Sequence, residues 1–398
     1  MKIYTTKFST TSKKCVVVDD MFLTKDSATT AGSKMLDGYE SLFESEVITR
    51  LSSKDYSLAG KVAVGEFAID LVGETSFCGS CEENGKLLNA CVEAVKDKEI
   101  LAGLSFDVNG AIRRATAQSD LICVKPTYGT VSRYGMIPVA CSGETVSVVA
   151  KTVSECKEIF DTIVGHDDKD GTSLLEEQCE NSKQNTPSLK KVAVLKSMLT
   201  SIDKDVKTKI DDLTTLLAKN NIEICEINDE FIKQSKTAWN ALMCAELCNN
   251  VSRYDGVKYG YRSNTFSNID ELYTNSRSES FGELLKAAIL YGSQVLSSDH
   301  YMPVYDKSLR IRRLVAEEFA KIFKAYDAVI LPSCSSLTYT KEQVSKNKFI
   351  SFEENIYTAP ASVTGLPAIV VGGVQIIGNH FAENTLFEIA KMYEKEGK

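Results

Sequence analysis

The chain has 398 residues, of which 43% are apolar, so it can bury a large core and is not a disordered segment. Its 46 basic and 54 acidic residues give a net charge of −8, which argues against a general nucleic-acid-binding surface. No apolar run is long enough for a membrane span, and the first residues lack the apolar segment of a signal peptide. The 12 cysteines lack the spacing of a disulfide framework, so we expect a reduced, cytoplasmic protein without membrane contact.

Strand and helix patterns alternate along the first half of the chain. We expect strands at 14–18, 56–64 and 121–124, the second with Gly60 as a kink or close approach. We expect helices at 44–52, 86–98 and 154–164, the last capped by Ser154. Residues 167–187 are polar and charged, and this predicted loop is a plausible boundary between two lobes.

The same alternation continues to the end of the chain. The predicted strands are 191–195, 222–227, 328–331, 367–371 and 374–377. The predicted helices are 204–219, 231–250, 278–298, 304–325 and 382–394. This pattern predicts an α/β fold with a largely parallel sheet, and without internal repeats it forms one domain over residues 1–398.

The stretch from Ser105 to Gly135 has the pattern of an active-site turn. Gly110 leads into a short helical segment whose first N–H groups could face an anion or an oxyanion. The residue that would carry a nucleophile there is Ala111, which has no reactive atom. The sequence therefore poses the question of whether the protein is an enzyme.

Cysteine and histidine patterns do not supply an alternative site. Cys78 and Cys81 form a Cys-x-x-Cys pair with Cys91 ten residues on, but no second pair or histidine has matching spacing. His166 lies in a polar loop, and the chain lacks a Gly-x-Ser-x-Gly elbow, a Walker loop and a dinucleotide fingerprint. We expect no metal and no cofactor.

Three carboxylates follow predicted strands. Asp19, Asp20 and Asp107 could meet at one edge of the sheet, where α/β folds place their sites. Acidic residues also cap strands commonly, so a paired-carboxylate site is the less favoured interpretation.

Motifs across nearly the whole chain resemble a known family. They include KMLDGYE at 34–40, KPTYGTVSRYG at 125–135, VSRYDGVKYGY at 251–261, SRSESFG at 276–282 and PASVTGLP at 360–367. In this order they resemble the amidase-signature family, and within it the A subunit of glutamyl-tRNA(Gln)/aspartyl-tRNA(Asn) amidotransferase. The resemblance implies a large mixed, mostly parallel sheet with helices on both faces. It also implies that the family's N-terminal helical region is missing here.

The resemblance implies a catalytic triad of serine, cis-serine and lysine. Position by position, the lysine falls on Asp19 and the nucleophilic serine falls on Ala111. The cis-serine falls near Leu87, in a segment, 82–89, that contains no serine. Because such residues act as a unit, we predict no catalytic residue and no intrinsic amidase or glutaminase activity.

The positions that the resemblance assigns to the substrate also differ. Its tyrosine falls on Trp239, its arginine on Ala288 and its aspartate on Asn355. A turn made by Asp107, Asn109, Gly110 and Arg113 is retained, and we interpret these four residues as structural support.

Three functions are compatible with this pattern. The leading hypothesis is a non-catalytic scaffold subunit that docks to partners resembling the B and C subunits of the amidotransferase, with tRNA contacted only through the complex. The second is a repurposed enzyme whose nucleophile is Thr116, Ser119, Ser105 or Cys123, although Cys123 lies in a predicted buried strand. The third is a stand-alone binding protein in which Trp239 faces a cleft for a more apolar ligand than glutamine.

Overall fold

The computed structural model describes residues 2–396 except 11, 13, 26 and 185–188. Its strands are β1 (Tyr4–Lys7), β2 (Cys15–Asp19), β3 (Ser57–Val62), β4 (Glu82–Glu83), β5 (Lys86–Leu87), β6 (Ile100–Asp107), β7 (Ile122–Lys125), β8 (Thr145–Ala150), β9 (Lys191–Leu195), β10 (Glu223–Ile227), β11 (Ala328–Pro332), β12 (Ala368–Val371) and β13 (Val374–Gly378). Its helices are α1 (Glu46–Ser52), α2 (Ala90–Val95), α3 (Ala111–Ala117), α4 (Val153–Ile163), α5 (Glu176–Gln184), α6 (Lys204–Lys219), α7 (Gln234–Val251), α8 (Ile269–Ser280), α9 (Glu283–Val295), α10 (Ser298–His300), α11 (Lys307–Ile322), α12 (Lys341–Lys346), α13 (Ile350–Thr364) and α14 (Glu383–Glu396).

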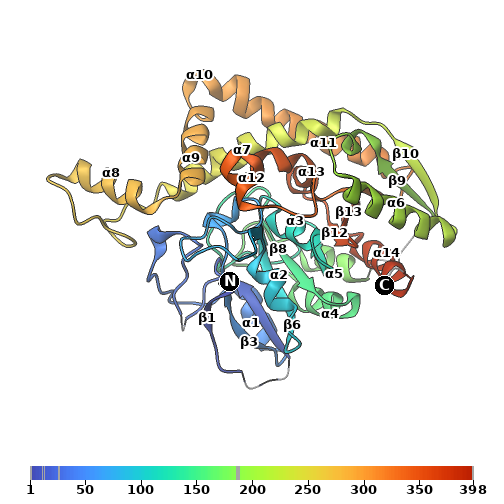
Figure 1. The fold of residues 1–398 in the computed structure, drawn as a ribbon, viewed down its shortest axis with the longest axis horizontal. Helices are drawn as coiled ribbons and strands as arrows, with labels where there is room; N and C mark the ends of the chain where they lie inside the picture. The colour runs from blue at the N-terminus through green and yellow to red at the C-terminus, as the bar shows by residue number, and fades with distance from the viewer. Residues whose placement is uncertain (1, 11, 13, 26, 185–188, 397–398) are drawn as a thin grey trace.

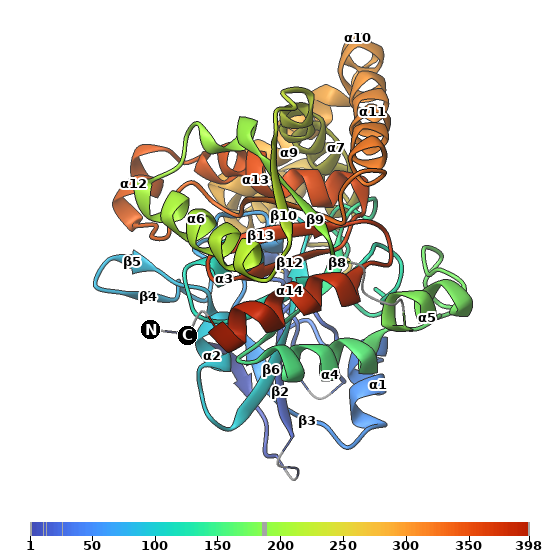
Figure 2. The ribbon, with the colours of Figure 1, turned by 90° about the vertical axis from the view of Figure 1, so that its right-hand side faces the viewer.

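Eleven strands form one sheet that helices surround (Figures 1 and 2), in the order β1-β3-β2-β6-β8-β7-β12-β13-β11-β9-β10. The pairs that β2 makes with β3 and β6 are parallel, and so are the pairs that β9 makes with β10 and β11. The strands between these two groups pair antiparallel. The predicted α/β class and large mixed sheet are confirmed, and the antiparallel centre is a feature that strand-by-strand patterns did not reveal.

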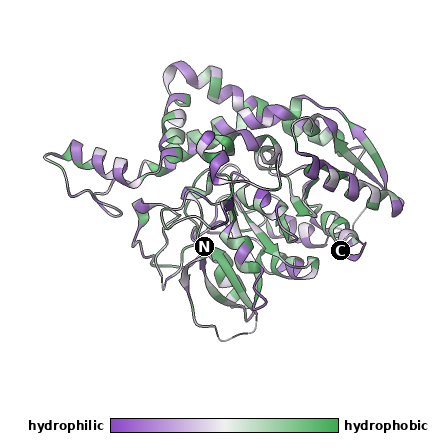
Figure 3. Cartoon of the chain, viewed as in Figure 1, coloured by the Kyte–Doolittle hydropathy of each residue, from purple (hydrophilic) through white to green (hydrophobic). Residues whose placement is uncertain are grey.

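Alternate residues of the strands enter two cores, one on each face of the sheet. In β2, Val16 and Val18 belong to the larger core, whereas Cys15 and Val17 belong to the smaller one. Because side chains of a strand alternate between faces, both faces must be covered. Buried residues of α4 and α14 pack into the larger core, and those of α2 and α3 pack into the smaller one. Most strands in the interior of the molecule are apolar along their length (Figure 3).

Several predicted helices have different limits in the structure. The helix expected at 154–164 is α4, and its N-cap is Thr152 instead of Ser154, because Thr152 and Glu155 form a capping box. The expected helix at 86–98 is only α2, since 86–87 lie in β5. The expected helix at 278–298 is divided into α8 and α9, and the Gly282 N–H at the break donates to Glu66 Oε2 at 2.9 Å.

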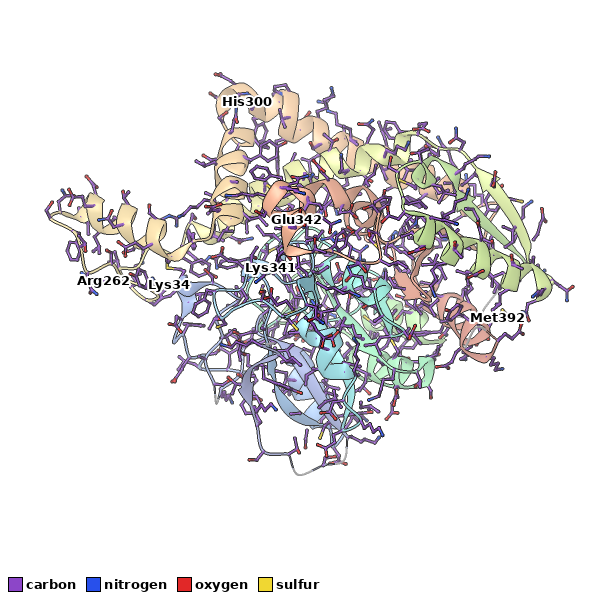
Figure 4. The ribbon with its side chains drawn as sticks, in the orientation of Figure 1. Lys34, Arg262, His300, Lys341, Glu342 and Met392 are labelled. Carbon is purple, nitrogen blue, oxygen red and sulfur yellow. The ribbon has the colours of Figure 1, made fainter. Side chains whose placement is uncertain are left out.

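The predicted loop at 167–187 contains the short helix α5, and residues 185–187 lie outside the described part. As expected, the backbone at Gly60 lies close to a neighbouring strand. A Cβ at this position would lie 2.5 Å from the Thr6 carbonyl oxygen. The α8 region projects from the body (Figure 1), and Lys34 lies near its base (Figure 4). The Nζ atom of Lys34 lies 4.0 Å from the centroid of the Tyr261 ring. Within the described residues, every helix is too short or too polar to cross a bilayer.

Candidate functional site

The turn after β6 is built as the sequence predicted. Gly110 is the N-cap of α3 with φ of 77°, and a Cβ at this position would lie 2.3 Å from Cβ of Thr358. Only glycine fits such a backbone at this distance. Ala111 is the first residue of α3 and only 7% exposed. The position of the expected nucleophile therefore carries a nearly buried methyl group.

Asp107 and Arg113 hold this turn through a fully buried ion pair. Arg113 Nε donates to Asp107 Oδ2 at 2.7 Å, and its Nη2 donates to Asp107 Oδ1 at 3.0 Å. The remaining guanidinium hydrogens bond the Thr358 carbonyl oxygen, Gln375 Oε1 and Ser362 Oγ. Burial raises the pKa of Asp107, but the Arg113 charge outweighs it, so the pKa of Asp107 lies below its usual value. These contacts connect β6, α3, α13 and β13.

Asp19, at the lysine position of the resemblance, is the last residue of β2 and is buried. Its Oδ2 accepts a hydrogen bond from Ser105 Oγ at 2.5 Å and one from the Phe106 N–H at 3.0 Å. Burial raises the pKa of Asp19 to about 7, even though both hydrogen bonds favour the carboxylate. Asp19 is thus a structural hydrogen-bond acceptor between β2 and β6.

Neighbouring Asp20 has different partners. Its Oδ1 forms an ion pair with buried Lys61 at 2.9 Å, and its Oδ2 accepts from the Thr30 N–H at 3.1 Å. Burial lowers the pKa of Lys61, against the attraction of Asp20. Asp19, Asp20 and Asp107 each bond separate groups, so the structure does not join them in a paired-carboxylate site.

The segment of the expected cis-serine forms a hairpin of β4 and β5. Leu87 is buried, and its N–H donates to the Tyr339 carbonyl oxygen at 2.8 Å. Lys341, which is labelled in Figure 4, lies at the start of α12 and forms an ion pair with Glu82 at 2.5 Å. Two residues beyond Leu87, the Asn89 side chain caps α2. The hairpin is therefore fixed to the segment before α12.

Arg114, which sequence reasoning did not single out, lies at the centre of the same region and is fully buried. Its Nε donates to the Leu71 carbonyl oxygen at 2.9 Å, and Nη2 donates to that of Asp70 at 3.1 Å. Its Nη1 donates to the Asn109 carbonyl oxygen at 2.8 Å and to Thr358 Oγ1 at 3.0 Å. Burial lowers the pKa of Arg114. The sequence could have indicated this residue, because Arg113 and Arg114 are consecutive in a helix whose other residues are small or apolar. A buried arginine needs several hydrogen-bond acceptors.

Asn355, at the aspartate position of the resemblance, is fully buried in a cluster of amides. Its side-chain amide lies 2.5 Å from Asn109 Oδ1 and 2.6 Å from Asn240 Oδ1. In either orientation of this amide a contact with Asn109 remains. The Asn109 amide nitrogen donates to the Ile69 carbonyl oxygen at 2.6 Å, so these polar groups are largely engaged with the protein.

Trp239 does not face a cleft. It is fully buried, its Nε1–H donates to the Val108 carbonyl oxygen at 3.2 Å, and a Cβ at Gly143 would lie 2.2 Å from its ring. The expectation that Trp239 lines a binding cleft is corrected, because α7 directs this ring into the core. Ala288, in contrast, lines a cavity of about 400 Å³ between α7, α9 and the start of α13.

The other candidate nucleophiles are engaged or suppressed. Thr116 Oγ1 donates to the Ile112 carbonyl oxygen at 2.8 Å, and Ser119 Oγ donates to that of Thr116 at 2.9 Å. Ser105 bonds Asp19. Burial raises the pKa of Cys123 well above its ordinary value, which disfavours the thiolate.

Cys78, Cys81 and His166, which the sequence suggests as possible site residues, do not form a common site in the structure. Burial raises the pKa of Cys81 to about 12, and it also raises the pKa of the less buried Cys78. His166 contacts Asp168 at 2.9 Å, and this contact raises its pKa. Over the described ranges, no three His, Cys, Asp or Glu residues are grouped so that they could hold a metal ion.

Comparisons with known proteins agree with the fold. The family model described as Amidase matches residues 94–387. The A subunit of glutamyl-tRNA(Gln) amidotransferase from Listeria innocua is 31% identical, covering 95% of this chain and 82% of the relative. The same subunit from Clostridium botulinum is 31% identical, covering 96% and 82%.

Solved structures show the same architecture. The A subunit of glutamyl-tRNA(Gln) amidotransferase from Thermotoga maritima superposes with a TM-score of 0.80 at 24% identity, covering 99% of this chain and 87% of that one. A variant of Kluyveromyces lactis allophanate hydrolase has a TM-score of 0.80 at 20% identity, covering 96% and 61%. At these identities the likeness establishes the fold and nothing further.

Proposed function

Because the chain belongs to the amidase family and is homologous to the A subunit of glutamyl-tRNA(Gln) amidotransferase, we propose that it is an A-subunit-like protein without amide-hydrolysing activity. Its role would be that of a non-hydrolytic scaffold subunit in an amidotransferase-type complex.

The observation that carries this proposal is the methyl group of Ala111 at the start of α3. Attack on an amide requires a nucleophilic atom there and a group that accepts its proton. Asp19 is committed to Ser105 and Phe106, and the β4–β5 hairpin replaces the serine-bearing segment that the resemblance implies. The hydroxyls of Thr116 and Ser119 donate to backbone carbonyl oxygens, and burial raises the pKa of Cys123. These observations support loss of hydrolysis and argue against a new nucleophile.

The partners follow from the relatives, which are subunits by name. We propose protein partners resembling the B and C subunits, which would use free ammonia or another donor, with tRNA contacted only through them. We also propose that residues 1–398 act as one cytoplasmic domain, since β7 and β12 join the two halves of the chain in a single sheet.

Two measurements test this function. Purified protein is incubated with glutamine and ammonia release is followed, with the active A subunit of a relative as positive control; no release above a heat-treated sample is expected. Activity that disappears in Ser105→Ala or Cys123→Ala would instead establish a repurposed enzyme. The second measurement tests the partners. The protein is mixed with homologues of the B and C subunits from its own organism, and stable co-elution is expected in size-exclusion chromatography. Separate elution would refute the scaffold role.

A further inference from the structure

The cavity beside Ala288 is a consequence of how α7 and α9 pack. At Gly292 the two helices touch, because a Cβ there would lie 2.0 Å from the Cys244 carbonyl oxygen. One turn earlier on α9, the small side chains of Ala287 and Ala288 leave a space of about 400 Å³ between the helices. A volume of this size is typical of pockets for small molecules.

The walls of this cavity are mainly apolar. Phe349 and Phe352 close it from the start of α13, and Tyr291 closes it from α9. Cys244 is fully buried, and burial raises its pKa, so its thiol stays neutral. The Asn240 amide points to protein partners, since its Nδ2 donates to the Phe352 carbonyl oxygen at 3.0 Å and its Oδ1 lies 2.6 Å from the Asn355 amide.

The single charge among the lining residues is the ammonium of Lys236, which lies beside Thr237 at the exposed end of the α7 face. In the part of the chain that the structure describes, no carboxylate lies within 4.0 Å of Lys236 Nζ. An anionic group of a ligand could therefore pair with Lys236 without displacing a protein partner.

These features select a class of ligand. An aromatic or branched apolar body matches the phenyl and alanine walls, and a carboxylate matches Lys236. Glutamine fits poorly, because no acidic residue lines the cavity and its ammonium group would lose water without gaining a counter-ion.

We propose that this cavity binds a small organic monocarboxylate whose apolar body lies between Ala288, Cys244 and Phe352 and whose carboxylate pairs with Lys236. The proposal goes beyond the scaffold function and does not depend on it, since Ala111 does not line this cavity. Ammonia release from glutamine tests the proposed loss of hydrolysis, whereas ligand binding tests this cavity. Either proposal can therefore fail without the other.

The test uses 4-fluorophenylacetate as probe, titrated with the full-length protein and followed by ¹⁹F NMR. We expect saturable binding, and binding of the neutral 4-fluorophenylacetamide that is weaker by about fivefold or more, because the amide lacks the charge-assisted contact. Excess glutamine should not displace the acid. Absence of saturable binding, or equal affinity for acid and amide, would overturn the proposal.

Variants assign the effect to the cavity. Lys236→Gln is expected to weaken binding of the acid by up to about fivefold and to leave the amide unchanged, because a partly exposed ion pair is worth about a fivefold factor at most. Lys324→Gln, an equal charge change on an exposed lysine after α11, should change neither. Ala288→Leu should fill the cavity and weaken both probes by about tenfold, with its folding checked by thermal melting. If Ala288→Leu does not fold, Lys236→Gln decides: unchanged binding of the acid would overturn the proposal.

Discussion

Replacing Asp19 with asparagine is expected to stabilise the protein above neutral pH, although the aspartate accepts two buried hydrogen bonds. Burial raises the pKa of Asp19 from 3.8 to about 7 in the folded state. Below about pH 4 the group is protonated in both states and its contribution does not change with pH. Between pH 4 and 7 the unfolded chain releases the proton while the folded chain keeps it, so stability falls as pH rises. Over about 3 pKa units, at about 1.4 kcal/mol each, the loss is about 4 kcal/mol.

Asparagine removes this loss and retains both contacts. Both hydrogen bonds end on Oδ2 of Asp19, and an amide oxygen at that position can accept from the Ser105 hydroxyl and from the Phe106 N–H. We expect the free energy of unfolding of Asp19→Asn, relative to the parent protein, to rise by about 3 kcal/mol between about pH 5 and pH 8. Urea denaturation at these two pH values measures it, with Asp212→Asn on the exposed face of α6 as the control substitution. A difference that does not grow with pH, or an Asp19→Asn protein less stable than its parent at pH 8, would refute the reasoning.

Three further predictions concern the turn and its surroundings. Ala111→Ser alone should release no ammonia from glutamine, because the proton relay is also missing; release above that of the parent would contradict this. Arg114→Met should lower the free energy of unfolding by at least about 3 kcal/mol in urea denaturation, since three buried carbonyl oxygens lose a donor, and an effect as small as that of exposed Arg310→Met would disprove it. Gly110→Ala should lower the free energy of unfolding by at least about 2 kcal/mol in urea denaturation, because its φ is 77° and its Cβ would meet Thr358. Gly171→Ala, with open space around it, should leave the free energy of unfolding nearly unchanged.

Elements with strong local patterns could be predicted from the sequence. The helix expected at 204–219 is α6 with the same limits, since its apolar residues follow the helical period and it has no internal glycine or proline. In contrast, β6 escaped prediction because it is almost entirely buried and contains glycine, serine and aspartate instead of an alternating pattern. Helix α13 also escaped prediction, because Pro360 lies inside it and proline normally ends a helical pattern.

The candidate site was also predicted only in part, because sequence reasoning locates positions but not contacts between distant segments. Asp19 and Ala111 were found by position, through the resemblance. The network of Arg114 was not found, because it joins α3 to α13 across more than 240 residues of sequence. Trp239 was placed wrongly for the same reason, since its contact with Gly143 belongs to the tertiary structure.

The β4–β5 hairpin would make the proposed loss of catalysis hard to reverse by single substitutions. A serine placed at Leu87 would enter a strand whose main chain bonds Tyr339 and whose neighbour Lys86 pairs with Thr340. A single base change could restore a hydroxyl at Ala111, but the path of the backbone at 82–89 would remain. Because this hairpin bonds residues 339–341, a change of its path would also disturb the segment before α12. Under the proposed function, the protein would therefore act through what it binds and not through hydrolysis.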